Sequence, residues 1–533
     1  MDSSFSSELN FMLALAPALL MSAAALEAWR SREPVERLWR RFNALTFAAL
    51  ALALAGLVAQ LALAPADGAA DAGMDGWLAA NAFGAWVSLL VQLLGAAIGV
   101  YSSKHLRGEP RQPVYATALA AVLAAVHLLL LANHWVVLIA AWAAIGGAMH
   151  PLLCFYGDRP FALLAAHKKR VTDRAADLLL IAAAALAWSE TGSGSFPVLW
   201  AHIAAGQASA ALAWSGVCLA LAVIARTALM PVHGWLVQVM EAPTPVSALL
   251  HAGVVNLGGY VLVLFAPLLG VSLAARWLLV AFGLVSAMVA GLVLLTRVSQ
   301  KVHLAWSTIA QMGFMLLECG LGLYLFAALH LLGHSLYKAH NFLNASSTVG
   351  ECGRTLVTGE ARNSGLSMAL AVPVALAVVF AVRAALGGGA WPWWWSAVLA
   401  LAWAPILWVP AAPQGRAAVP VRLAAALAMT VLLTLAAGLV DHAPLGVAND
   451  PLAPAGLVAL AGMAAMYLGM AAFQLRPRAV TAIRRWVYAG FYMDEGYTHW
   501  VLRLWPVRWA GAGRAAAPAA WGLRGSAWGR SGS

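Results

Sequence analysis

Apolar runs long enough to cross a bilayer recur along almost the whole chain. A transmembrane helix needs about 20 predominantly apolar residues, and such runs lie at residues 9–29, 44–65, 78–100, 115–132, 134–156, 175–189, 208–230, 245–268, 270–295, 302–323, 324–347, 366–386, 393–411, 420–441 and 453–475. Hydrophobic residues make up 63% of the chain and charged residues 10%, which leaves too little polar surface for a soluble domain. We therefore predict an all-α fold, a polytopic transmembrane bundle of about fifteen spans. Because no basic region precedes the first run, we expect a transmembrane helix there rather than a cleaved signal peptide.

The loops between these runs predict the orientation of the chain. Lys and Arg collect in cytoplasmic loops, and here basic and acidic loops alternate. The basic set includes Arg37, Lys104, Lys169, Arg297 and Arg416, and the opposite set includes Asp67, Glu190 and Asp441. This order indicates an odd number of spans, with the N-terminus outside and the C-terminus cytoplasmic. The formal net charge of +11 is therefore read as loop charge rather than as a nucleic-acid-binding surface.

The segment after Gln474 is strongly basic and contains nine arginines. It is predicted to lie on the cytoplasmic side. Such a tail serves either as an orientation signal or as a docking surface for a soluble partner, and both readings can hold.

The four cysteines indicate neither a metal site nor a redox site. Cys154, Cys218, Cys319 and Cys352 lie far apart, with no CxxC pair and no metal-ligand spacing to a histidine. We expect packing residues at these positions, and neither a metal nor a cofactor in this chain.

A stripe of titratable residues marks the run AALHLLGHSLYKAHNFL. His330, His334 and Lys338 are spaced i, i+4 and i+8, so a helix places them within about 80° of one face and over roughly 12 Å of rise. Ionisable residues inside a membrane are costly and are usually functional. The stripe predicts a ladder of protonatable groups along the membrane normal. The alternative is that these groups only hydrogen-bond to neighbouring helices.

A second stretch contains residues that interrupt helices. Pro231, Pro243 and Pro245 predict breaks, and broken helices in transporters mark ion paths. Arg226 lies just before the first break, and His251 lies in the next span. A lone histidine such as His251 is often a core residue whose ring nitrogens are hydrogen-bonded. Its place beside the break nevertheless favours a role in ion movement.

Two further ionisable residues are candidates for the same path. Lys301 begins a span and is followed by His303, although basic loop charge that sets orientation explains Lys301 equally well. Orientation does not explain Asp177, near the start of the sixth span, because the rule concerns Lys and Arg. Asp177 is the candidate counter-ion for Arg226.

Four of these stretches carry a resemblance to a known superfamily. ARTALMPVHGWL, APTPVSALLHAG, KVHLAWSTIAQMGFMLL and ALHLLGHSLYKAHNFL resemble, in this order, the antiporter-like subunits of respiratory complex I and of Mrp sodium/proton antiporters, over roughly residues 75–365. The resemblance implies two inverted five-helix repeats with broken helices, and a central chain of polar groups that conducts protons. It also implies a proton pathway formed by Lys338, His334, His330, Lys301 and His251, with Asp177 as a partner of these groups. The implied units are 1–114 (N-terminal helices), 115–268 and 269–442 (the repeats), 443–475 (the last span) and 476–533 (the basic tail).

The chain departs from the superfamily's pattern at three places. Ala143 follows Trp142 where the complex I subunits have a glutamate, and Arg226 stands where they have a lysine. Arginine does not release its proton in any accessible pH range, so the first half-channel is expected to differ from that of the superfamily. The segment from Tyr492 to Arg508 resembles the one that precedes a long lateral helix in complex I, and no such helix is expected here.

Within the superfamily the chain most resembles the DabB family, the membrane subunits of complexes that accumulate inorganic carbon. The segments HSLYKAHNFL, FYGDRP and AAHKKRVTDRAADLLL carry this resemblance. It implies a multi-pass protein of the bacterial inner membrane whose cation flux, of protons or Na⁺, drives CO2 hydration to bicarbonate by DabA. DabA is a soluble, cytoplasmic partner of the carbonic anhydrase type, with zinc held by Cys, His and Asp. The expected docking residues are Tyr492, Asp494 and Glu495.

Two other functions remain open. The chain could be a proton-pumping subunit of an NADH-quinone oxidoreductase or of an Mrp-type antiporter. It could also be a passive anchor for a soluble enzyme, but an anchor would tolerate leucine along the stripe. In each case we expect catalysis in another subunit and not in this chain.

Overall fold

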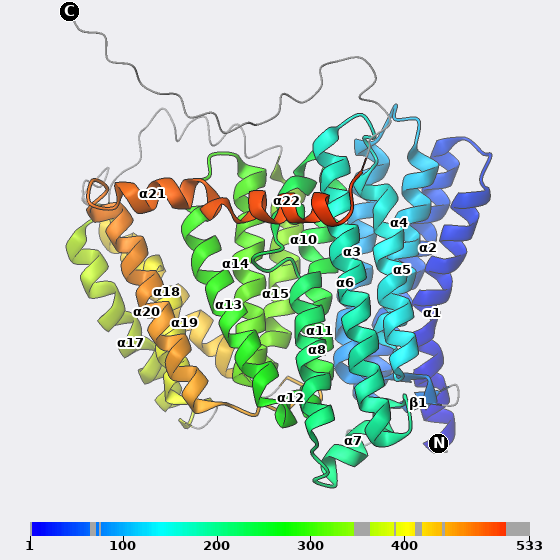
Figure 1. The fold of residues 1–533 in the computed structure, drawn as a ribbon, viewed down its shortest axis with the longest axis horizontal. Coiled ribbons are helices and arrows are strands. Elements are labelled where there is room, and N and C mark those ends of the chain that lie inside the picture. Colours follow the sequence, from blue (N-terminus) through cyan, green and yellow to red (C-terminus); the bar gives the residue numbers. More distant parts are fainter. Residues whose placement is uncertain are drawn as a thin grey trace, which may run out of the picture.

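A computed structural model describes residues 3–63, 71–73, 76–345, 363–388, 391–410, 418–439 and 443–507. These residues form a single bundle of helices that stand side by side (Figure 1). The N-terminus lies at the lower face in this view, and the last helices lie across the upper face. The acidic residues Asp67 and Asp441, the basic Arg416 and the tail beyond residue 507 lie outside the described residues.

The helices overlap the apolar runs, although the helix Pro160–Thr191 begins well before the run predicted at 175–189. They are α1 (Ser3–Arg30), α2 (Val35–Leu63), α3 (Ala82–His105), α4 (Gln112–Leu130), α5 (Trp135–Leu153), α6 (Pro160–Thr191), α8 (Ala210–Arg226), α10 (Thr244–Ala252) with α11 (Leu257–Leu264), α13 (Leu273–Leu294), α14 (Gln300–Leu321), α15 (Tyr324–Leu343), α17 (Gly365–Ala385), α18 (Trp393–Trp403), α19 (Ala418–Gly438) and α20 (Ala453–Leu475). The connections contain the hairpin of β1 (Asp71–Gly73) and β2 (Leu78–Ala80), and the short helices α7 (Phe196–Ala204), α9 (Gly234–Gln238) and α12 (Ala266–Val271). The predicted all-α membrane fold is confirmed.

Within the described ranges, eleven helices are long and apolar enough to cross a membrane. The apolar helices α8 and α18 are shorter. Helix α6 carries several charged residues, and α15 carries three histidines and a lysine, so both are more polar than an ordinary span. The exact number of spans and the two inverted repeats stay predictions.

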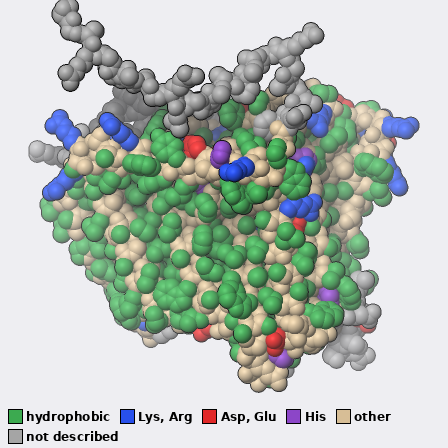
Figure 2. Space-filling model, in the orientation of Figure 1, with side chains coloured by type: hydrophobic (Ala, Val, Ile, Leu, Met, Phe, Trp, Pro, Cys, Tyr) green, Lys and Arg blue, Asp and Glu red, His purple; other side chains and the backbone are tan. Residues whose placement is uncertain are grey.

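The outer surface suits lipid. Hydrophobic side chains cover the middle of the face in Figure 2, and Lys and Arg gather toward its upper edge. Large apolar side chains such as Leu178 and Leu468 are about two-thirds exposed, and in water such a surface would be an aggregation hazard. The basic edge is the one that the loop pattern predicts to be cytoplasmic.

The helical path is interrupted where the prolines lie. Helix α8 ends at Arg226, and Ala228 takes a positive φ of 55° before the chain passes Pro231 and enters α9. Helix α10 begins after Pro243, with Pro245 in its first turn, where a missing N–H costs nothing. Pro231 therefore lies in the connection between α8 and α9, whereas Pro243 and Pro245 begin a helix.

The C-terminal segment lies along the upper face. Helix α21 (Thr481–Tyr488), a 3₁₀ turn (Gly490–Tyr492) and α22 (Met493–Leu504) run across the ends of the upright helices (Figure 1). Helix α22 contacts α6 and α9. It therefore connects a transmembrane helix with the segment that follows the first break.

Candidate functional site

The stripe on α15 faces the interior of the bundle. Helix α15 packs on α10 and α14, and Lys338 and His334 are buried. The Lys338 Nζ donates to the Leu304 carbonyl at 3.1 Å. No acidic side chain among the described residues lies within ion-pair distance of that ammonium group. Lys338 is thus a buried cation solvated by a backbone carbonyl.

His251 joins this stripe from α10. Its ring stacks on Phe342 of α15, with 4.6 Å between the ring centroids. Neither ring nitrogen of His251, nor Nε2 of His334, has a protein hydrogen-bond partner, although all three atoms are buried. A buried polar group without a partner costs about 1–3 kcal/mol, so internal water is the expected partner at these positions.

Glu318 was missed by the sequence reasoning. This buried carboxylate on α14 lies 2.8 Å from His330, measured from Oε2 to Nδ1. The rings of His330 and His334 follow, 5.9 Å apart between centroids. An acidic residue within the apolar run MLLECGL could have been identified by the criterion that singled out Asp177.

Lys301 lies at the upper end of α14, outside the stripe. It is half-buried, and its charged neighbours are Arg159 and Glu241, which pair with each other at the surface at 3.6 Å. His303, two residues farther along α14, has a buried Nδ1 without a protein partner.

The expected contact between Asp177 and Arg226 is present. The Arg226 guanidinium pairs with one oxygen of Asp177 and donates to the Trp142 carbonyl at 2.9 Å. Arg174 pairs with the other Asp177 oxygen at 3.2 Å. Arg226 thus has a carboxylate partner, whereas Lys338 has a backbone carbonyl.

A polar cavity lies beside this pair. It has a volume of about 320 Å³ and is lined by Ala143, Gly146, His150, Lys169, Asp173 and Arg226, among others. Ala143 therefore leaves open space at the position where the complex I subunits have a glutamate. The cavity gives Arg226 and Asp177 a polar surrounding.

Asp494, one of the expected docking residues, points into the protein. It pairs with the buried Lys168 and accepts a hydrogen bond from Gln238 Nε2 at 3.1 Å. Tyr492 and Glu495 are exposed. The geometry therefore leaves Tyr492 and Glu495 available to a partner, whereas Asp494 is engaged within the chain.

Two more contacts attach α22 to α6. Thr498 accepts a hydrogen bond from Lys168 at 2.8 Å, and the hydroxyls of Tyr497 and Thr172 are hydrogen-bonded. Burial raises the pKa of Tyr497 to about 12, so this phenol keeps its proton near neutral pH. We call the set of Lys168, Thr172, Asp494, Tyr497 and Thr498 the α22 clasp.

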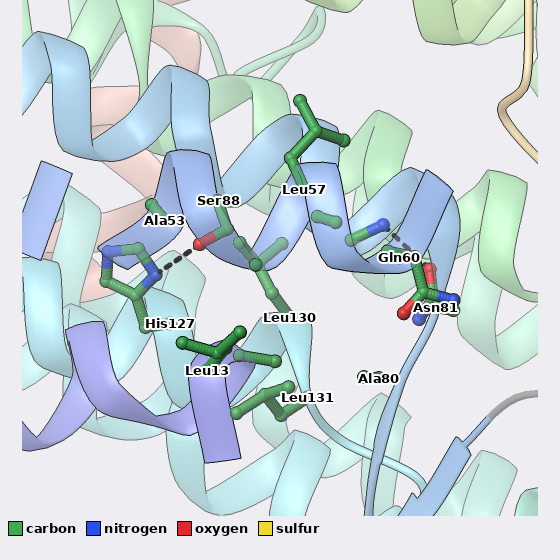
Figure 3. A pocket seen from close by; sticks show the side chains of 14 residues that line it. Leu13, Ala53, Leu57, Gln60, Ala80, Asn81, Ser88, His127, Leu130 and Leu131 are labelled. Atoms are coloured by element: carbon green, nitrogen blue, oxygen red, sulfur yellow. Dashed lines mark hydrogen bonds between the residues drawn. The ribbon is translucent and has the colours of Figure 1, made fainter. Parts of the chain in front are cut away.

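A small cavity in the N-terminal helices is shown in Figure 3. It measures about 20 Å³, room for a single water. His127 in its wall bonds to Ser88 at 3.1 Å and to Gln92 at 2.8 Å. This cavity is too small for a substrate.

In the part of the chain that the structure describes, no cluster of three or more His, Cys, Asp or Glu side chains could hold a metal ion.

Comparison with known proteins shows which family the chain resembles. Residues 132–394 match the family described as "NADH:quinone oxidoreductase/Mrp antiporter, TM". The Mrp complex from Dietzia sp. DQ12-45-1b superposes with a TM-score of 0.56 at 21% identity, over 93% of this chain and 60% of that one, which shows a shared fold. Residues 132–394 thus resemble the antiporter-like membrane subunits of the complex I and Mrp superfamily.

Within this superfamily the sequence is similar to DabB proteins. It is 43% identical over 284 residues to the probable inorganic carbon transporter subunit DabB of Hydrogenovibrio crunogenus, covering 51% of this chain and 55% of the relative. It is 40% identical over 353 residues to DabB2 of Halothiobacillus neapolitanus, covering 64% of each. The match thus spans less than two thirds of either relative. The resemblance stated from the motifs is confirmed.

Proposed function

We propose that this chain is the proton-conducting membrane subunit of an inorganic carbon uptake complex. Ion movement through it would be coupled to CO2 hydration, and so to bicarbonate accumulation, by a soluble partner. The observation that supports conduction is the column of the partly buried His330 and the buried His334 and Lys338, with the buried His251 beside it. The similarity to inorganic carbon transporter subunits supports the substrate.

The chemistry of the column suits proton transfer. A charge inside the membrane costs several kcal/mol unless it is paired, neutralised or hydrated. Lysine and histidine can lose that charge by releasing a proton, whereas arginine cannot. Lys338, which has a carbonyl and no carboxylate at its ammonium group, is the residue on which we expect conduction to depend most.

Catalysis is assigned to the partner. We propose a soluble, DabA-like zinc protein with Cys, His and Asp ligands, docked on the cytoplasmic face of a bacterial inner membrane. Tyr492 and Glu495 are exposed on the upper face and are available for this contact. In this proposal the N-terminus lies outside, the C-terminus lies in the cytoplasm and the conducted cation is H⁺.

The second candidate is a subunit of an Mrp-type antiporter or of a respiratory complex. The match to the antiporter family and the fold shared with an Mrp complex favour it. The protein that co-purifies in detergent discriminates between the two functions. A large soluble zinc protein supports carbon uptake, and quinone-reductase or Mrp subunits would reverse the choice.

The proposal is tested by replacing Lys338 with alanine. In a host that lacks carbonic anhydrase and expresses the complex, we expect Lys338→Ala to abolish growth in ambient air, because the column loses its lysine proton acceptor. Complex assembly, measured by co-purification, should persist. His340→Ala, an exposed position on the last turn of the same helix, is the matched control and should leave growth unchanged. Normal growth of the Lys338→Ala strain would rule out a role of this column in conduction.

A further inference from the structure

Glu318 lies near the lower end of α14, on the side opposite to α22. The helix ends at Leu321, and a tight turn at Gly322, whose φ is 77°, leads into α15. Leu321 and Gly322 accept backbone hydrogen bonds from Leu452 and Asp450, at the start of α20. Glu318 is therefore within one turn of the face that the sequence predicts to be outside, whereas Lys301 lies at the other end of the same helix.

The four ionisable groups follow one another in space. Glu318 contacts His330 at 2.8 Å, and His334 and Lys338 lie one and two turns farther along α15. Each helical turn advances about 5.4 Å. The column thus runs from a carboxylate near the lower face toward a lysine near the upper face.

Arg276, a buried cation on the neighbouring helix α13, has partners other than Glu318. Arg276 of α13 donates to the Gly320 carbonyl at 3.2 Å and pairs with Asp450 at 2.8 Å. Within the described residues, His330 is the only ion-pair partner recorded for Glu318. Tyr324, at the start of α15, has a buried hydroxyl without a protein partner and supplies a further polar group near this end.

We propose that Glu318 is the outer terminus of the proton path. It exchanges protons with the outer aqueous phase and passes them to His330, so the path crosses the membrane within α14 and α15. In the transfer step, the carboxylic acid of Glu318 gives its proton to the Nδ1 of His330, leaving a carboxylate and an imidazolium that keep their hydrogen bond. The imidazolium then passes a proton on toward His334 and Lys338. This inference rests on the proposed function, because it assumes that the column conducts protons.

A purely structural Glu–His contact makes a different prediction for the isosteric amide. Glutamine keeps the size of glutamate and can still hydrogen-bond to the imidazole, so a structural role would largely survive Glu318→Gln. A proton carrier would not survive it, because the amide does not exchange a proton near neutral pH. The variant therefore separates the two roles.

The experiment measures proton flux in proteoliposomes that contain the full chain, purified with its partner, and a pH-sensitive dye. We expect Glu318→Gln to lower the flux at least tenfold. Glu190→Gln, an exposed glutamate at the lower end of α6, is the matched control and should stay within twofold of the original protein. Lys338→Ala is measured beside them.

Each result has one meaning. Near-normal flux in Glu318→Gln together with lost flux in Lys338→Ala would overturn the role of Glu318 and leave the proposed function intact. Near-normal flux in both variants would overturn the proposed function itself. Should Glu318→Gln fail to assemble, Glu318→Met removes the carboxyl without leaving a polar group in the interior. Failure of both variants to assemble would make Glu318 a structural residue and overturn the inference.

Discussion

Two buried cations differ in their partners, and this difference separates their roles. Arg226 is held by Asp177 and by a backbone carbonyl, and its charge is permanent. Within the described residues Lys338 has a backbone carbonyl and no carboxylate at its ammonium group, and it can release its proton. Arg226 is therefore suited to fixing the electrostatic field beside its cavity, and Lys338 is suited to carrying a proton.

Asp177→Asn tests the pairing of Arg226. Removing one member of a buried ion pair typically costs about 3–5 kcal/mol because the other charge is left uncompensated. We expect a clear fall in the thermal unfolding temperature of the protein in detergent. Arg174→Gln is the control, because it removes the exposed partner of the same carboxylate and should cost less than about 1 kcal/mol. Equal losses in the two variants would contradict a buried, essential pair.

At the scale of elements, the α22 clasp connects the upper face to the segment after the first helix break. Asp494 holds Lys168 of α6 and Gln238 of α9 together. A side chain at Gly234 would collide with Asp494, because a Cβ built there lies 1.3 Å from its carboxylate oxygen. The absence of a side chain at residue 234 thus allows α22 to pack close to the backbone of α9.

Gly234→Ala should release the clasp. The added methyl group displaces Asp494 and leaves Lys168 without its carboxylate, so we expect faster protease cleavage between α21 and α22 and a lower unfolding temperature. Gly333→Ala is the control, since a Cβ at that helical glycine meets nothing within 4 Å. Unchanged proteolysis in Gly234→Ala would show that the clasp does not depend on this contact.

At the scale of the whole molecule, two of the polar regions among the described residues concern the proposed ion path. One is the column of α14 and α15, and the other is the pair of Arg226 and Asp177 beside its cavity. The column runs from Glu318 near the lower end of α14 to Lys338 on α15. This arrangement suits conduction across the membrane through a single chain, and it does not suit a passive anchor.

A proton-coupled complex should fail when the gradient is removed. We expect a protonophore to reduce inorganic carbon accumulation in intact cells to the level of cells without the complex, whereas a sodium ionophore should have little effect. Accumulation that survives the protonophore and falls with the sodium ionophore would identify Na⁺ as the coupling ion. Accumulation that survives both would identify the chain as an anchor.

Local patterns determined most of the fold. In lipid, a helix satisfies the hydrogen bonds of the backbone N–H and C=O groups within its own segment. Apolar runs of sufficient length therefore predict the spans without knowledge of packing. The stripe of His330, His334 and Lys338 was also predictable, because residues one turn apart share a helix face. The pairing of Asp177 with Arg226 was also proposed from the sequence, since a buried cation needs a counter-ion.

Contacts between distant residues were decided by tertiary packing. The charge of Glu318 was visible in the sequence, but its contact with His330 depends on how α14 and α15 turn against each other. Asp494 was expected to face a partner, yet it reaches Lys168, 326 positions away in the chain. Hydrophobicity and helical period specify which residues enter the membrane and share a face, whereas the rotation and the neighbours of each helix depend on side-chain packing across the whole bundle.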